Sequence, residues 1–146
     1  MKRIAIALLS TLALLQVSAA EGEWLTDLAK AKQKAKAESK MILMDFTGSD
    51  WCPPCKALHK NVLSSKEFTE YAKKNLVLVE VDFPRSKAQS AELKKANKAL
   101  ATQFGIKAYP TIVVLDSNGK ELSKKSGYGG EKPGAFIAGI QALKKS

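Results

Sequence analysis

The chain has 146 residues, a formal net charge of +10 and an apolar fraction of 45%, and a chain of this length is expected to form one domain. Its lysines are spread over the predicted helices, which favours solvated helix faces; attraction to an acidic partner or a membrane surface is the alternative. No arginine cluster or aromatic ladder in the sequence points to a nucleic acid partner.

The N-terminus has the pattern of an export signal. Two basic residues precede an apolar run at residues 4–15, which is too short to span a bilayer, and small residues follow it. We therefore expect a signal peptide at residues 1–20 and a single domain at residues 21–146. An uncleaved membrane anchor is the alternative. Export would place the protein in the periplasm or outside the cell.

Hydrophobic periodicity and turn residues predict an alternation of helices and short, apolar strands. Two strands with helices between them form a parallel unit, and the last two strands form a hairpin around an Asn-Gly turn. The sequence thus predicts an α/β domain with a mixed sheet of about four strands and helices on both faces. Helices are expected at residues 24–39, 52–63, 64–74, 87–104 and 134–144, and strands at residues 41–47, 76–83, 111–115 and 120–125.

The two cysteines of the chain, Cys52 and Cys55, stand three positions apart at the start of a predicted helix. A disulfide between them closes too small a loop to constrain the unfolded chain much, so stabilisation does not explain the pair. The start of a helix stabilises a thiolate and lowers a cysteine pKa from about 8.5 to roughly 3.5–7.5. We therefore assign attack on a disulfide to Cys52. Cys55, expected to be more buried, would resolve the mixed disulfide.

Metal and haem sites explain the cysteine pair less well. Structural zinc needs four ligands, and the chain offers two cysteines and one histidine, His59. Covalent haem attachment needs a histidine directly after the second cysteine, where Lys56 stands. We expect neither a metal nor a cofactor, because the sulfur atoms themselves carry the electrons. His59, one turn beyond Cys55, is either a residue of the helix face or a proton donor near the sulfurs.

Two stretches resemble signatures of a known family. Residues 44–56 (MDFTGSDWCPPCK) resemble the active-site segment of the thioredoxin family, and residues 104–112 (FGIKAYPTI) resemble its second signature, a loop that ends in a cis-proline. The order of helices and strands is similar to that family over nearly all of residues 21–146. The resemblance implies a thioredoxin fold with an extra N-terminal helix.

The resemblance also implies roles for individual residues. Pro110 would be the cis-proline facing the cysteines, and the backbone of Tyr109 would pair with an extended substrate. Asp45 would be the buried acid that helps to deprotonate Cys55, in agreement with the raised pKa of an acid inside an apolar strand. The alternative for Asp45 is a surface acid at a strand end. Trp51 would be an exposed aromatic residue beside the cysteines, and the alternative is a core residue.

The chain departs from the family pattern in four places. The loop between Asp45 and Cys52 is one residue longer than usual. Lys60 stands where the active-site helix usually has a proline, and a Pro-Pro pair replaces Gly-Pro between the cysteines. Tyr109 stands in place of a smaller aliphatic residue, and we expect this change to narrow the choice of substrate or to alter the redox potential.

These observations predict an exported thiol–disulfide oxidoreductase that reduces protein disulfides and receives electrons from a membrane partner. Dedicated oxidases of the resembled family usually carry a helical insertion for which this chain has no room. A disulfide oxidase or isomerase, or an interaction module without catalysis, are the alternatives. We expect a monomer that acts on protein disulfides and not on nucleic acid.

Overall fold

A computed structural model of the chain describes residues 23–145. The predicted signal peptide at residues 1–20 lies outside the described residues. In the described part, no helix is both long enough and apolar enough to cross a bilayer. The elements in chain order are β1 (Trp24–Leu25), α1 (Leu28–Glu38), β2 (Met41–Thr47), α2 (Pro53–Leu58), the π-helix η1 (His59–Leu63), α3 (Lys66–Asn75), β3 (Leu76–Asp82), α4 (Ala91–Gln103), β4 (Thr111–Leu115), β5 (Glu121–Ser126), α5 (Pro133–Ala142) and the 3-10 helix η2 (Leu143–Lys145).

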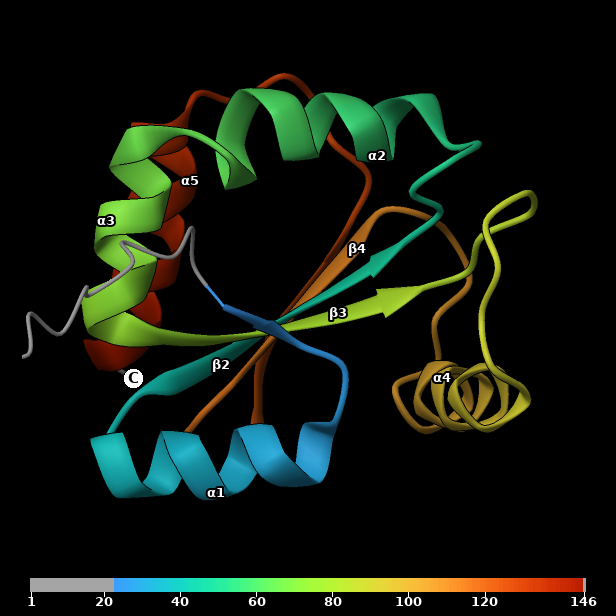
Figure 1. Cartoon of the computed structure of the whole chain (residues 1–146). Helices are drawn as coiled ribbons and strands as arrows, with labels where there is room; N and C mark the ends of the chain where they lie inside the picture. Colours follow the sequence, from blue (N-terminus) through green and yellow to red (C-terminus); the bar gives the residue numbers. More distant parts are fainter. Residues whose placement is uncertain (1–22, 146) are drawn as a thin grey trace, which may run out of the picture.

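The strands form one mixed sheet in the order β1-β3-β2-β4-β5 (Figure 1). β3 is parallel to both β1 and β2, whereas β4 is antiparallel to β2 and β5. Every residue of β2 is buried, because helices cover both faces of the sheet at this central strand. The predicted mixed sheet with helices on both faces is confirmed.

The prediction of about four strands missed the short strand β1. Periodicity assigned Trp24–Leu25 to the first helix, but these residues pair with β3. Helix α1 begins later because the carboxylate of Asp27 accepts hydrogen bonds from the N–H groups of Ala29 and Lys30 and so caps the helix. The two apolar residues before the cap are thereby free to extend the sheet.

The helices form two layers, one on each side of the sheet (Figure 1). α2, η1, α3 and α5 cover one face, and α1 and α4 cover the other. Because side chains alternate along a strand, Leu43 of β2 belongs to the first core and Met44 belongs to the second. Phe68 anchors the first core and Phe46 the second, and both side chains are completely buried.

The topology brings three loops together at one end of the sheet. β2 and β3 end there because they are parallel, and Thr47 lies opposite Asp82 at their ends. β4 begins there because it is antiparallel to β2, and Thr111 lies opposite Phe46. The segment with the cysteines, the loop after β3 and the residues before β4 therefore share this end of the sheet.

The sequence predicted one regular helix from the cysteines to residue 63, but the helix changes type partway along. α2 ends at Leu58, and the π-helix His59–Leu63 continues it, with the Ser64 N–H donating to the His59 carbonyl oxygen at 2.9 Å. Lys60, which stands where the resemblance places a proline, lies in this wider turn. A π-helical turn makes a helix irregular without a proline, so the helix is irregular here although Lys60 replaces that residue.

Two further helices begin later than predicted, and serine caps explain both starts. α4 begins at Ala91 and not at residue 87, because the Ser90 hydroxyl accepts a hydrogen bond from the Leu93 N–H at 3.1 Å. α3 begins after Ser65, whose hydroxyl accepts a hydrogen bond from the Phe68 N–H. Residues 83–90 form a loop, and this loop contributes to the site.

Candidate active site

A disulfide joins Cys52 and Cys55 at the start of α2, with their Cα atoms 5.3 Å apart. Cys52 has extended backbone angles and caps the helix, and its sulfur accepts a hydrogen bond from the Cys55 N–H at 3.4 Å. Pro53 and Pro54 occupy the first turn, where a missing N–H group costs no intrahelical hydrogen bond. The predicted position of the pair at a helix start is confirmed.

The two cysteines are equally buried, each with 3% of its surface exposed. The expectation that Cys55 is the more buried of the two is therefore wrong for the disulfide form. The cysteines differ instead in what surrounds them. Of the two, Cys55 is the one that lines a cavity of about 310 Å³, together with Asp45, His59 and Glu80.

Asp45 is the buried acid of the site, with 5% of its surface exposed. It lies in β2 on the face that carries α2, and within the described residues its Oδ1 atom has no hydrogen-bond partner. Burial, together with the nearby carboxylates of Glu80 and Asp82, raises the pKa of its carboxyl group to about 7. The alternative of a surface acid at a strand end is wrong.

The loop between β2 and the cysteines, residues 48–50, is tied to the loop after β3. Ser49 donates from both its N–H and its hydroxyl group to the carboxylate of Asp82, at 2.9 and 2.5 Å. The carboxylate of Asp50 accepts hydrogen bonds from three consecutive backbone N–H groups, at residues 85–87. These hydrogen bonds lower the pKa of Asp50 to about 2. The longer loop of this chain thus holds a second loop beside the cysteines.

Trp51 is partly exposed and belongs to an aromatic cluster at the mouth of the site. Its indole N–H donates to the Phe83 carbonyl oxygen at 2.8 Å, and its ring meets the Tyr109 ring edge-on at a centroid distance of 5.9 Å. The guanidinium carbon of Arg85 lies 4.0 Å from the centre of the indole. The alternative of a simple core residue is wrong, and sequence reasoning did not identify Phe83 or Arg85.

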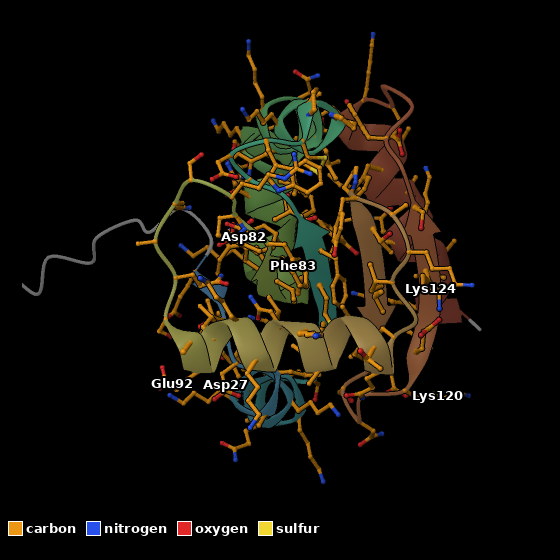
Figure 2. The ribbon with its side chains drawn as sticks, turned by 90° about the vertical axis from the view of Figure 1, so that its right-hand side faces the viewer. Asp27, Asp82, Phe83, Glu92, Lys120 and Lys124 are labelled. Atoms are coloured by element: carbon orange, nitrogen blue, oxygen red, sulfur yellow. A yellow bond between two sulfur atoms is a disulfide. The ribbon has the colours of Figure 1, made fainter. Side chains whose placement is uncertain are left out.

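The second predicted motif meets the first through Tyr109. The peptide bond between Tyr109 and Pro110 is cis, as the resemblance implies. The Tyr109 ring packs against Phe83 as well as Trp51, with a centroid distance of 5.2 Å to Phe83. The Gly127 N–H donates to the Pro110 carbonyl oxygen at 2.7 Å and fixes the backbone on that side. Phe83, against which the Tyr109 ring packs, directly follows the last residue of β3, Asp82, and Figure 2 shows both above α4.

His59 lies at the start of the π-helix and reaches the same cavity as Cys55 and Asp45. Its side chain is close enough to Glu80 to influence the pKa of that carboxyl group. The two interpretations of His59, as a residue of the helix face and as a proton donor near the sulfurs, both remain compatible with this position. Within residues 23–145, no three His, Cys, Asp or Glu side chains come together as a metal site.

Comparisons with known proteins agree with this geometry. A family model described as a thioredoxin-like domain matches residues 28–142. The chain is 34% identical over 130 residues to "Disulfide bond reductase DsbH" of Chlamydia pneumoniae, a match that covers 89% of this chain and 75% of that protein. It is 31% identical over 135 residues to "Thioredoxin-related protein DsbJ" of the same organism, covering 88% of this chain and 39% of DsbJ. A solved structure described as "DsbH Oxidoreductase" superimposes with a TM-score of 0.79 and 29% identity over 95% of both chains.

Proposed function

The chain belongs to the thioredoxin-like family and is a thiol–disulfide oxidoreductase, and we propose that it works as a reductase of disulfide bonds in other proteins. The observation that carries the proposal is the Cys52–Cys55 disulfide at a helix start, with Cys55 and the buried Asp45 on one cavity. The reducing direction is supported by the similarity to a protein described as a disulfide bond reductase. It is also supported by the order of elements in the described residues, which contains no helical insertion of the kind that dedicated oxidases usually carry.

The reaction starts from the dithiol form of the enzyme. The Cys52 thiolate attacks one sulfur of a substrate disulfide, forms a mixed disulfide and releases the other substrate sulfur as a thiolate, which takes a proton from solvent. Cys55 then gives its proton to the Asp45 carboxylate, and its thiolate attacks the Cys52 sulfur. The second substrate thiolate leaves, and the enzyme carries the disulfide described above. Two electrons have passed from the cysteines to the substrate.

Substrate contact is assigned to Trp51, Tyr109 and Pro110. Trp51 and Tyr109 are partly exposed and their rings touch each other beside the cysteines. An extended substrate segment is expected to pair with the backbone of Tyr109, next to the cis-proline, in the manner of an added strand. The aromatic rings then supply apolar contacts for the substrate side chains next to its disulfide.

We place the protein outside the cytoplasm, in the periplasm or secreted, after removal of residues 1–20. The support is the signal-like N-terminal pattern of the sequence. A reductase in an oxidising compartment needs a supply of electrons, which we assign to a membrane electron-transfer partner. The enzyme is proposed to act as a monomer and without a cofactor.

Reduction of insulin disulfides by dithiothreitol tests the activity. The wild type should accelerate the reaction, and Cys52→Ser should remove the acceleration. Cys55→Ser is the matched variant: it keeps the attacking thiol and should accumulate a mixed disulfide that Cys52→Ser cannot form. Equal rates for the wild type and Cys52→Ser would refute catalysis and leave the interaction module as the function.

The equilibrium with glutathione tests the direction of electron flow. A reduction potential near that of reducing thioredoxins, about −270 mV, would support a reductase. A potential near that of strong oxidants, about −120 mV, would instead make the protein an oxidase. The measurement is made on the same purified chain, with Cys52→Ser as the sample that cannot form the disulfide.

A further inference from the structure

Two neighbouring strands change from apolar to acidic side chains where they reach Cys55. On the face that carries α2, β2 presents Leu43 and then Asp45, and β3 presents Leu78 and then Glu80. The register of the parallel pair puts Asp45 directly opposite Glu80. Adjacent strands lie about 4.8 Å apart, so the two carboxyl groups start from neighbouring backbone positions on the same face. Sequence reasoning considered Asp45 alone and did not identify Glu80.

Asp45 and Glu80 also share the cavity that Cys55 lines. Its volume of about 310 Å³ is enough for several water molecules, since one occupies about 30 Å³ in the liquid. Within the described part of the chain, the Oδ1 atom of the buried Asp45 has no hydrogen-bond partner. An unpartnered, buried carboxyl oxygen beside a polar cavity is costly unless the group is protonated or bonded to water.

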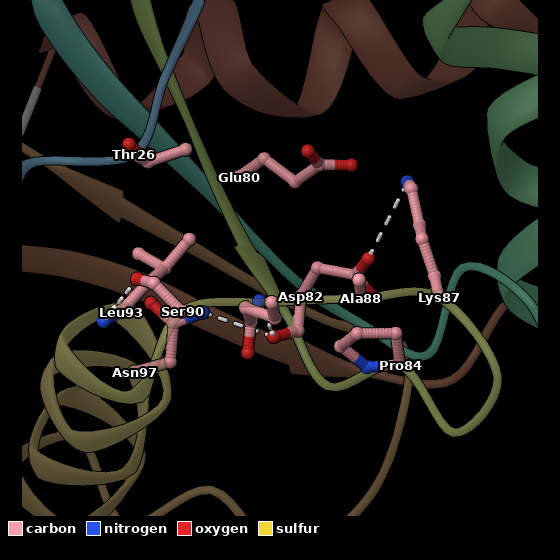
Figure 3. Close-up of a pocket in the computed structure, with 10 residues that line it drawn as sticks. Thr26, Glu80, Asp82, Pro84, Lys87, Ala88, Ser90, Leu93 and Asn97 are labelled. Atoms are coloured by element: carbon pink, nitrogen blue, oxygen red, sulfur yellow. Dashed lines mark hydrogen bonds and ion pairs between the residues drawn. The ribbon is translucent and has the colours of Figure 1, made fainter.

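Glu80 belongs to the lining of this cavity and of a second one. It is partly exposed, and it also lines a pocket of about 280 Å³ between β3 and the loop before α4 (Figure 3). Lys87 lines both cavities and reaches Asp82 with its Nζ atom at 3.9 Å. The Asp45 side chain is thus buried, whereas its neighbour Glu80 is partly exposed and lines both pockets.

We propose that Asp45 and Glu80 form a proton-relay pair, so that the proton released by Cys55 passes to Asp45 and leaves to solvent through Glu80. In this step the S–H bond of Cys55 breaks and an O–H bond forms on Asp45. The proton then moves through cavity water to the Glu80 carboxylate and on to bulk water, and no electrons are transferred. The order reverses when the enzyme is reduced again. Glu80 acts through Asp45 and touches no reacting sulfur, so it is a positioning residue.

The charges around the pair fit this assignment. Burial raises the pKa of Glu80, and the carboxylate of Asp82 on the same strand raises it further. Lys87 from the loop and His59 from the π-helix act in the opposite direction, and Lys56 of α2 also lines the cavity. A negative charge on Glu80 in turn raises the pKa of Asp45. The charge on Glu80 therefore affects how readily Asp45 holds a proton.

Infrared spectroscopy of the oxidised chain tests the pair without any catalytic turnover. The C=O band of protonated Asp45 is identified as the band that Asp45→Asn removes. Glu80→Gln should lower the pH midpoint of this band by about one unit, a tenfold weaker proton affinity, because the charge opposite Asp45 is gone. On dilution into heavy water, the same variant should exchange the Asp45 proton about tenfold more slowly.

Two variants control the experiment. Glu80→Asp keeps the charge, so the pH midpoint of the Asp45 band and the exchange rate of its proton should stay close to those of the wild type. Glu121→Gln removes a charge from β5 and should change neither quantity. An unchanged midpoint or an unchanged exchange rate in Glu80→Gln would overturn the proposal. The proposed relay rests on the proposed reductase function, but different experiments would refute each of them. Inactivity of the wild type towards insulin would refute the function, whereas the titration of the oxidised chain alone decides the proton-relay pair.

Discussion

The indole ring of Trp51 lies so close to Gly48 that a Cβ atom at position 48 would be 2.4 Å from the indole Cε2 atom. The two residues are also joined by the backbone, because the Trp51 N–H donates to the Gly48 carbonyl oxygen at 3.2 Å. Space, and not an unusual backbone angle, therefore requires glycine here. Gly48 allows Trp51 to fold back over its own loop and to reach Phe83.

Gly48→Ala should displace Trp51 and weaken the fold. The new methyl group must push the indole away from its hydrogen bond with the Phe83 carbonyl oxygen. Forcing an extra methyl group into a packed site costs about 1–3 kcal/mol, which urea unfolding of the oxidised chain would measure. Gly139→Ala is the control, because in the described residues no atom beyond its chain neighbours and its own helix backbone lies within 4 Å of a Cβ added there in α5. This variant should gain about 0.5–1 kcal/mol, and a wild-type stability for Gly48→Ala would contradict the packing.

Asp45→Asn should make the oxidised protein more stable at neutral and alkaline pH. The pKa of Asp45 rises from 3.8 to about 7 on folding. Between these values the folded chain keeps a proton that the unfolded chain loses, so the stability of the wild type falls as the pH rises. At 1.4 kcal/mol per unit of pKa, the whole shift corresponds to a loss of about 4 kcal/mol in the free energy of unfolding, which is an upper value for a buried group.

The measurement is the unfolding free energy of both proteins from pH 4 to pH 8. The advantage of Asp45→Asn should grow over this range and level off above pH 7, because asparagine stays neutral throughout. Asp27→Asn is the matched control, since Asp27 is an exposed helix cap. A constant difference between wild type and Asp45→Asn at all pH values would show that Asp45 ionises normally.

Asp50→Ala should release the loop that follows β3. Asp50 holds the N–H groups of Arg85, Ser86 and Lys87, and loss of the carboxylate should speed hydrogen exchange at these three amides, as read by nuclear magnetic resonance. Because folding lowers the pKa of Asp50, its contribution to the stability of the folded chain is complete above pH 3.8 and is lost as the pH falls towards 2. Asp116→Ala, in the β4–β5 turn, should leave the three amides unchanged.

Asn97→Ala should destabilise the end of β3. The Asn97 side chain is 1% exposed, and its amide donates to the Asp82 carbonyl oxygen at 2.9 Å. Loss of a buried hydrogen bond of this kind costs about 1–3 kcal/mol, measurable by thermal or urea unfolding. Asn118→Ala, at an exposed turn position, should change stability by less than about 0.5 kcal/mol. Equal effects of the two substitutions would rule out a special role for Asn97.

The sequence was most informative where one local signal decides the structure. β2 and β4 match their predicted bounds because each is a short, mostly apolar run limited by turn residues. The helix start at Cys52 followed from two prolines that suit a first turn. The buried position of Asp45 was predicted as well, because the acid stands inside such a run.

The features that sequence reasoning missed all depend on which strands become neighbours. Glu80 looks like an ordinary acid in a strand until the parallel register places it opposite Asp45. Arg85 and Phe83 join Trp51 only because β3 ends beside the loop of the cysteines. The strand β1 was hidden in the same way, since its two residues also fit the start of a helix. Such partners lie far apart in the sequence, and periodicity within one segment carries no information about them.

The two outer strands of the sheet have a consequence for the behaviour of the protein at high concentration. A long, uncharged outer strand offers free N–H and C=O groups to another molecule and promotes aggregation. Here one border of the sheet is β1, which is two residues long. The other is β5, which carries Lys124 and Lys125 in exposed positions. Neither border suits the strand-by-strand growth of aggregates. Under the proposed function, the chain would bind extended substrate segments at its active-site end and not through the edges of its sheet.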